Sequence, residues 1–213
     1  MEIDFNEYIK QKIEFYESLK KIEINNEQFS SIINIENEIF KKINLDFEDF
    51  ILRRKQKERL SAKENNDFKK KLISLYPDFK KISDCNNPAI YWFKIRHFEK
   101  SDNKKLLKKF VQARNTKNGW WSKPTKDNEN LTEYLYLGKV EKNLFNRFIQ
   151  HLGLGHKMTS SLKLCQWFNK LDAVDLEFQF LELNKEEVDY LEDIENILWR
   201  KLKPLIGAEP RIK

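Results

Sequence analysis

The 213-residue chain has few glycines and prolines, five of each, and only two cysteines. The low glycine and proline counts argue against a collagen-like or low-complexity chain. Cys85 and Cys165 are far apart and lack the close spacing of metal ligands. We therefore expect two reduced thiols, and neither a disulfide framework nor a zinc site.

The sequence also lacks a long apolar run. A membrane-spanning helix needs about 18 or more consecutive apolar residues, and no such stretch is present. The first residues, Met1 to Asp4, are acidic and begin no apolar run, so a secretory signal is not expected. We predict a cytoplasmic protein without a membrane partner.

Aromatic residues, in contrast, are plentiful, with 16 Phe and 5 Trp. A chain of this length with so many large apolar side chains can bury a substantial core. Its net charge is +6, but the charge is unevenly distributed: residues 1–50 sum to −6 and residues 171–213 to −5. Residues 51–170 hold 28 Lys and Arg against 11 Asp and Glu. A basic middle of this kind suits a phosphate-binding surface, although a lysine-rich composition also follows from an A/T-rich genome.

Residues 1–82 have the periodicity of helices. Apolar residues recur at three- and four-residue spacing from Phe5 to Leu19, and a second periodic stretch runs from about Gln28 to Ile43. The turn-forming residues 84–88 then end this region. We predict an N-terminal helical segment, residues 1–82, that packs on the rest of the chain or on a second copy, followed by a domain over residues 83–213.

From Ala89 onward, strands alternate with helices. The predicted strands are Ala89–Ile95, Thr132–Val140 and Leu176–Leu183, and each is rich in β-branched or aromatic residues or alternates in polarity. The predicted helices are Lys104–Arg114, the stretch between the caps Asn143 and Gly153, Thr159–Phe168 and Glu186–Leu202. The fold class is therefore α+β, with a small, mainly antiparallel three-stranded sheet flanked by helices.

Two tripeptides occupy the first two predicted strands, Ala-Ile-Tyr at 89–91 and Tyr-Leu-Gly at 136–138. The helix that follows carries Arg147 and, four residues later, His151. Residues at this spacing lie on one face of a helix. The planar guanidinium of Arg147 is suited to holding phosphate oxygens in a bidentate manner.

The last predicted helix carries Glu195, nine residues before Pro204. The order and spacing of all these elements, over residues 88–207, resemble the GIY-YIG nuclease superfamily, which includes restriction and homing-type endonucleases and related repair nucleases. Two positions depart from the family pattern. Ala89 replaces the first glycine of the family name, and Gly207 stands where the family often has an asparagine that supports the active site.

The resemblance implies a metal-dependent DNA endonuclease, and it implies a role for each motif residue. Tyr91 would polarise or deprotonate the attacking water, and Arg147 and His151 would act beside it. Glu195 would hold one divalent cation, Mg²⁺ or Mn²⁺, which prefers oxygen ligands. Tyr136 would belong to the same catalytic group.

Three positions near these residues remain open. Lys139, at the end of the second strand, is predicted to bind substrate phosphate. Glu192 and Asp193 lie on the same helix as Glu195 and are alternatives to it as the acidic ligand. Each residue taken alone has an ordinary structural explanation, such as a packed tyrosine or a solvated charge.

The 44 residues between Tyr91 and Tyr136 are more than the minimal family module has. This insertion contains a basic helix, which is either a DNA-contacting element or a plain basic surface. We favour the first, and its predicted substrate-binding residues are Lys104, Lys105, Lys108, Lys109 and Arg114.

Two functions follow as hypotheses. The first is an endonuclease of restriction or defence type that hydrolyses phosphodiester bonds in double-stranded DNA, with a homodimer favoured for cutting both strands. The second is a catalytically weak or inactive protein with the same fold that binds nucleic acid or assembles with other proteins.

Overall fold

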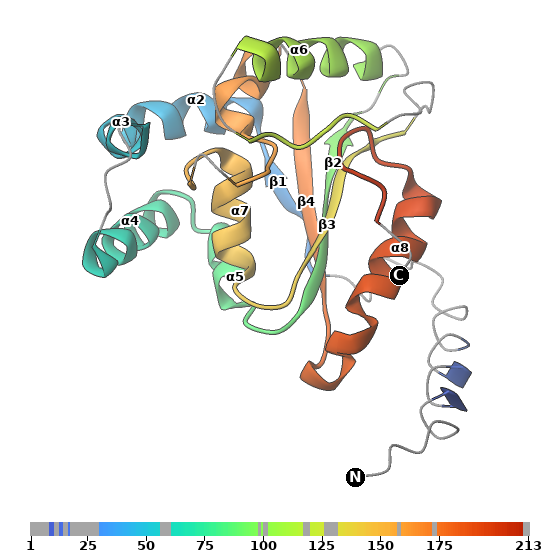
Figure 1. Ribbon diagram of the computed structural model, residues 1–213. Coiled ribbons are helices and arrows are strands. Elements are labelled where there is room, and N and C mark those ends of the chain that lie inside the picture. Colours follow the sequence, from blue (N-terminus) through green and yellow to red (C-terminus); the bar gives the residue numbers. More distant parts are fainter. Residues whose placement is uncertain are drawn as a thin grey trace.

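The computed structural model describes residues 9–10, 13–14, 17, 30–55, 61–97, 99, 102–116, 120–125, 132–156, 159–171 and 174–210. The fold is α+β, with an antiparallel four-stranded sheet in the order β1-β4-β2-β3 (Figure 1). The strands are β1 (Ile33–Ile35), β2 (Ala89–Arg96), β3 (Tyr134–Val140) and β4 (Asp175–Glu182).

The sheet has one strand more than the sequence predicts. The three predicted strands are confirmed with small shifts at their ends, and the additional strand, β1, falls where a helix was predicted from Gln28. In β1, Ile33 and Ile35 are buried and pair with Phe178 and Leu176 of β4. A strand of three residues is too short for its alternation to be visible in the sequence.

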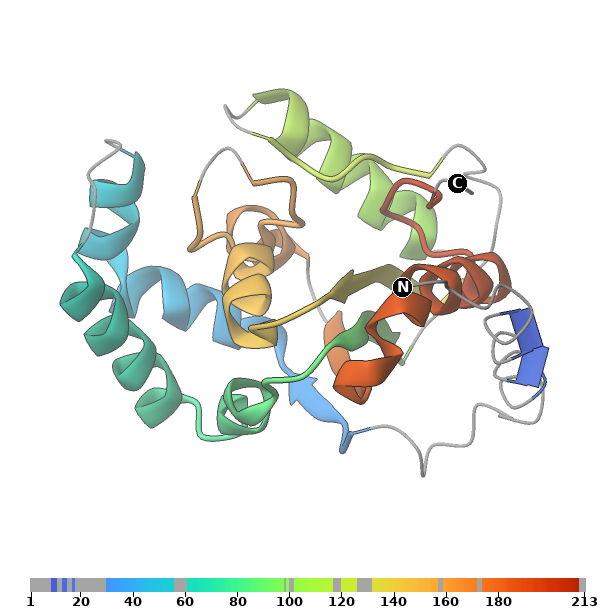
Figure 2. The same cartoon turned by 60° about the horizontal axis from the view of Figure 1, so that its bottom comes forward.

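The helices that follow β1 lie along one side of the sheet or at its upper edge, and the last helix covers the other side (Figures 1 and 2). The helices are α2 (Asn37–Asp46), α3 (Glu48–Lys55), α4 (Ala62–Leu75), α5 (Phe79–Asp84), α6 (Asp102–Thr116), α7 (Leu144–Leu152) and α8 (Leu191–Leu202). The first predicted helix, Phe5 to Leu19, lies outside the described residues apart from Ile9, Lys10, Ile13, Glu14 and Glu17.

The helices predicted at α6, α7 and α8 are confirmed, but the one predicted over Thr159–Phe168 is wrong. Residues 159–163 form no helix, and two short 3₁₀ turns follow, Leu164–Gln166 and Phe168–Lys170. A helix cannot pass through Lys163, because its φ is 53°, in the left-handed region. The predicted start of the last helix is also a 3₁₀ turn, Lys185–Tyr190, and the α-helix begins at Leu191.

Both faces of the central strand β2 are buried, and its side chains enter two separate clusters. Tyr91 and Phe93 belong to the larger cluster, under α5 and α7. Ile90 and Trp92 belong to a smaller cluster with Ile194 and other residues of α8. This alternation places the Tyr91 side chain on the α7 side of the sheet.

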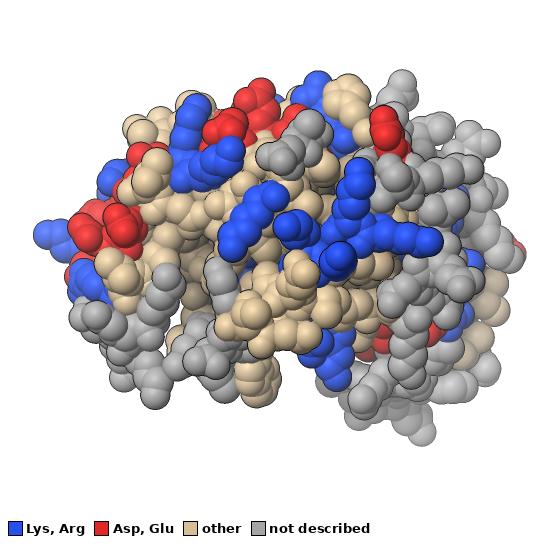
Figure 3. Space-filling view, turned by 90° about the horizontal axis from the view of Figure 1, so that it is seen from above, with Lys and Arg blue, Asp and Glu red and all other residues tan. Residues whose placement is uncertain are grey.

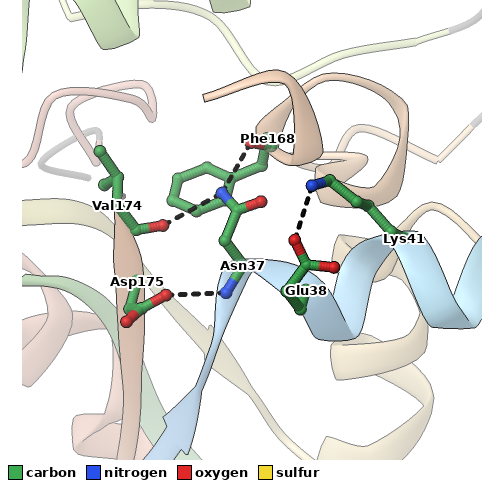
Figure 4. Close-up of polar contacts among 6 residues, drawn as sticks. All are labelled: Asn37, Glu38, Lys41, Phe168, Val174 and Asp175. Carbon is green, nitrogen blue, oxygen red and sulfur yellow. Dashed lines mark hydrogen bonds and ion pairs between the residues drawn. The ribbon is translucent and has the colours of Figure 1, made fainter. Parts of the chain in front are cut away.

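Residues that follow β1 are joined to β4 and to the loop before it by hydrogen bonds. Asn37, at the start of α2, donates from its side-chain amide to the carbonyls of Phe168 (3.0 Å) and Val174 (3.1 Å). Its backbone N–H donates to Asp175 Oδ1 at 2.8 Å (Figure 4). Nearby, Lys41 pairs with Glu38. No helix in the described part of the chain combines the length and the apolarity that crossing a bilayer requires.

Candidate active site

Two tyrosines on neighbouring strands begin the site. Tyr91 of β2 lies opposite Gly138 of β3, and Tyr136 precedes Gly138 on β3 by two residues. A Cβ atom at Gly138 would lie 2.7 Å from the Tyr91 hydroxyl and 2.8 Å from the Tyr136 ring. The glycine of the Tyr-Leu-Gly motif is therefore required, because both tyrosine side chains cross its Cα.

Helix α7 supplies the next two residues. The Asn143 side chain accepts a hydrogen bond from the backbone N–H of Asn146, and Gly153 ends the helix with φ 95°, as the sequence predicts. Arg147 Nε donates to the Tyr91 hydroxyl at 2.9 Å, and its Nη2 donates to the Tyr136 hydroxyl at 3.4 Å. The structure therefore brings Arg147 to both tyrosines.

His151, one turn after Arg147, completes this group, with its Nε2 lying 2.9 Å from the Tyr91 hydroxyl oxygen. On the other side of the ring, the backbone N–H of Leu162 donates to Nδ1 at 3.3 Å. Nδ1 is therefore an acceptor, and a neutral imidazole must carry its proton on Nε2. His151 thus donates to the Tyr91 oxygen, which receives a second hydrogen bond from Arg147.

The rings of His151 and Tyr91 are fully buried, and both are held in their neutral forms. Burial, together with the positive charges of Arg147 and Lys163, lowers the pKa of His151 well below its usual 6.5. Burial and the neighbouring Tyr136 raise the pKa of Tyr91 well above 10.0, and Arg147 opposes this rise. At neutral pH the phenol therefore keeps its proton.

Glu195 reaches the site from α8. Its carboxylate lies 3.4 Å from Lys139 Nζ, and Glu192, one turn earlier, lies 3.8 Å from the same atom. Burial raises the pKa of Glu195, while Lys139 and, more weakly, Arg147 lower it. Lys139 follows Gly138 on β3, so this ion pair lies beside the strand that carries Tyr136.

Within the described residues, no group of three or more His, Cys, Asp or Glu side chains is arranged to hold a metal ion. Mg²⁺ does not need such a group, because it keeps several water ligands and often uses only one or two carboxylates. Glu195 fits this requirement, since its side chain is 15% exposed and has a lysine as its ion-pair partner. Glu192 is a second carboxylate beside the same lysine.

A pocket of about 660 Å³ opens beside this group. Its lining includes Tyr136, whose hydroxyl accepts from Arg147, and Ser160, whose carbonyl accepts from Arg147 Nη1 at 3.1 Å. Gly207 also lines the pocket. Its φ of 130° strongly favours glycine, so an asparagine is disfavoured at this position.

The predicted substrate-binding residues divide into two groups. Arg114, at the end of α6, lines the pocket, whereas the four lysines of this helix are exposed and do not line it. Figure 3 views the molecule from the α6 side and shows Lys and Arg side chains gathered across this face. The four lysines are Lys104, Lys105, Lys108 and Lys109.

Some contacts of the site were not predicted from the sequence. Gln150 accepts from Arg147 Nη1 at 2.9 Å, and its position three residues after Arg147 was a usable signal. The backbone partners Ser160 and Leu162 carried no signal in their side chains. Trp120 and Lys123, which line the pocket, belong to a loop that the sequence marks only as polar and basic.

Comparison with protein-family models, curated proteins and solved structures finds no match for the chain.

Proposed function

We propose that the protein is a metal-dependent endonuclease that hydrolyses phosphodiester bonds in double-stranded DNA, in a restriction or defence role. One observation carries this proposal. The four residues Tyr91, Tyr136, Arg147 and His151 form one hydrogen-bonded group, and Glu195 of α8 is paired with Lys139, which follows Gly138 on β3. These four and Glu195 are the residues that resemble the catalytic set of the GIY-YIG superfamily.

Arg147 is the group best suited to meet the phosphate. It is partly exposed, it borders the pocket through its partners Tyr136 and Ser160, and its guanidinium stays positive at any working pH. Hydrolysis adds one water to phosphorus and breaks one P–O ester bond, and negative charge grows on the phosphoryl oxygens in the transition state. A guanidinium that is already oriented stabilises that charge without further reorganisation.

Tyr91 is fully buried behind Arg147, and its raised pKa argues against a phenolate base at neutral pH. Of the two roles that the resemblance allows, polarising the attacking water suits this phenol better than deprotonating it. In the arrangement described, Tyr91 and His151 also orient Arg147.

Glu195 is the residue that would hold Mg²⁺ or Mn²⁺, and the ion would supply positive charge to the leaving oxygen. Lys139 is already paired with this carboxylate. It is therefore placed to neutralise Glu195 in the resting protein and to bind a phosphate oxygen when Glu195 engages the ion.

The alternative is a protein of the same fold that binds DNA without cutting it. Two observations favour it: Tyr91 is fully buried, and the Glu195 carboxylate already has a lysine as counterion. Both hypotheses predict DNA binding by the basic face, so binding does not separate them. Cleavage does.

The test is to incubate purified protein with supercoiled plasmid and Mg²⁺, with and without EDTA, beside the Arg147→Ala variant. We expect conversion to nicked and linear DNA that requires Mg²⁺ and that the variant loses. Intact plasmid with both Mg²⁺ and Mn²⁺, from protein that still binds DNA, would favour the non-cutting alternative. Light scattering with and without DNA would show whether a homodimer forms, as cutting both strands favours.

A further inference from the structure

The pocket beside Arg147 is built from segments far apart in the sequence. Residues 120–125 form one wall, and backbone hydrogen bonds hold this wall on both sides. Ser122 N–H donates to the Ser161 carbonyl at 3.1 Å, and Gly207 N–H donates to the Lys123 carbonyl at 2.8 Å. Thr125 N–H also donates to the Leu205 carbonyl at 3.0 Å. The wall is therefore fixed to the body of the protein.

Three side chains give the pocket its chemistry. Trp120 lines it and is 59% exposed, which is unusual for so large an apolar side chain. Its neighbour Trp121 is buried against Phe110, with ring centroids 5.8 Å apart, and so anchors the backbone there. Arg114 and Lys123 add two positive charges to the lining. An exposed indole beside cations is the combination that holds a base by stacking and its phosphate by charge.

The size and shape of the pocket decide which form of DNA fits. Its volume of about 660 Å³ lies in the range of roughly 300–1,000 Å³ that takes single small-molecule units. A base that is paired and stacked within a duplex cannot enter a concave pocket unless it leaves the stack. An unpaired nucleotide enters without that cost.

We propose that this pocket binds one unpaired nucleotide adjacent to the scissile phosphate, with the base against Trp120 and a phosphate between Arg114 and Lys123. The inference rests on the proposed function, because it places the nucleotide next to the phosphate that Arg147 would hold. It adds a substrate class: DNA in which paired and unpaired strands meet, such as a duplex with a single-stranded tail.

The test compares two labelled duplexes, one blunt and one with a short single-stranded tail, by fluorescence anisotropy in EDTA so that no cleavage occurs. We expect the wild-type protein to bind the tailed duplex about tenfold more tightly, as stacking of one base on an aromatic side chain typically gives. Trp120→Ala should lower that ratio toward one, because the stacking contact is lost.

Two controls separate stacking from charge. A tail of abasic nucleotides carries the same phosphates without bases, and it should lose the preference as Trp120→Ala does. Lys109→Ala removes an exposed charge of α6 that does not line the pocket. This variant should bind both duplexes more weakly, by the same factor. A wild-type ratio near one, or a ratio that survives Trp120→Ala, would overturn the proposal.

Failure of the proposed nuclease function would give a different result from failure of the pocket proposal. If the protein cleaves no DNA with Mg²⁺ or Mn²⁺ but still prefers the tailed duplex in EDTA in a Trp120-dependent way, the nucleotide pocket is supported and the proposed nuclease activity is contradicted. If the protein cleaves blunt and tailed duplexes equally, with no dependence on Trp120, the nuclease activity is supported and the nucleotide pocket is contradicted.

Discussion

Helices α7 and α8 lie on opposite faces of the sheet, and they hold their proposed catalytic side chains in different ways. On α7, Arg147 and His151 are held by several directed hydrogen bonds, which reach two tyrosines and two backbone groups. On α8, Glu195 is held by an ion pair, 3.4 Å from Lys139. The first arrangement is assembled before substrate arrives, whereas the second can exchange its partner.

This difference has a physical basis. A phosphate-binding group gains from being oriented in advance, because reorganising it during the reaction would cost free energy. A metal-binding carboxylate must instead accept an ion that comes and goes, and a lysine counterion is easily replaced. We therefore expect changes on the α7 side to alter stability and activity together, and changes on the α8 side to alter activity alone.

The sharpest test compares Arg147→Ala with Glu195→Ala. Each variant should cleave plasmid at least about a hundredfold more slowly, because each loses a charge that acts in the transition state. Only Arg147→Ala should lower the free energy of unfolding substantially, by about 1.5–3 kcal/mol, since hydrogen bonds to a charged group are removed. Glu195→Ala should change it by less than about 1 kcal/mol. Urea denaturation followed by circular dichroism measures both.

Glu192→Ala is the matched control for Glu195. Glu192 lies one turn away and shares the same lysine, so its removal changes the local charge equally. Its cleavage rate should stay within a few-fold of wild type. A Glu192 variant that loses activity while the Glu195 variant keeps it would move the metal ligand to Glu192 and contradict our assignment.

Gly138→Ala tests whether the α7 arrangement depends on the close approach of the tyrosines. The new methyl would lie 2.7 Å from the Tyr91 hydroxyl, so both rings must move. We expect a loss of about 1–3 kcal/mol in the free energy of unfolding, as for other overpacked sites, together with a large drop in cleavage. A variant with normal stability and activity would show that Tyr91 and Tyr136 are not held as described.

The elements that position the site were largely predictable, and the interactions within it were not. Helix α7 was predicted because Asn143 and Gly153 mark its ends by local chemistry, and β2 because its apolar run is continuous. The pairing of Tyr91 with Gly138 depends on strand register across 46 intervening residues, which no local pattern encodes.

Backbone partners were beyond prediction for a related reason. Leu162 and Ser160 act through a peptide N–H and a carbonyl, and their side chains say nothing of these roles. They reach α7 because residues 159–163 form no helix, where the sequence predicts one. The pocket wall was missed in the same way, since Trp120 joins it through long-range backbone pairing of its neighbours.

His151 offers a smaller effect with a defined sign. Its pKa is near 6.5 when unfolded and well below that when folded, so below about pH 6.5 the unfolded chain binds a proton that the folded protein does not. The stability present above this pH should therefore fall as the pH is lowered, by up to about 1.4 kcal/mol per pH unit from this residue. His151→Gln should remove that part of the decline, as urea midpoints near pH 7.5 and 5.5 would show.

Glu195→Gln is the contrasting variant on α8. The pKa of Glu195 is raised in the folded protein, so the stability that Glu195 contributes is present at low pH and is lost as the pH rises through the folded value. As the pH rises, the free energy of unfolding of Glu195→Gln should therefore fall less steeply than that of the wild type. For His151→Gln, it should fall less steeply as the pH is lowered. If the free energy of unfolding of Glu195→Gln depended on pH as that of His151→Gln does, the opposite pKa shifts of these two residues would be contradicted.

The smallest effect per residue concerns α6, which attracts DNA in our proposal and takes no part in the chemistry. Changing Lys104, Lys105, Lys108 and Lys109 to Gln should weaken duplex binding and flatten the slope of log affinity against log salt by about 0.9 for each phosphate that is no longer neutralised. Cleavage at saturating DNA should be unchanged. The control changes Lys63 and Lys70, which are also exposed but belong to α4. Helix α4 lies on a different side of the molecule from α6 (Figure 1). An unchanged slope in the α6 variant would show that this face points away from DNA, and weakening that differs between sequences would indicate base recognition instead.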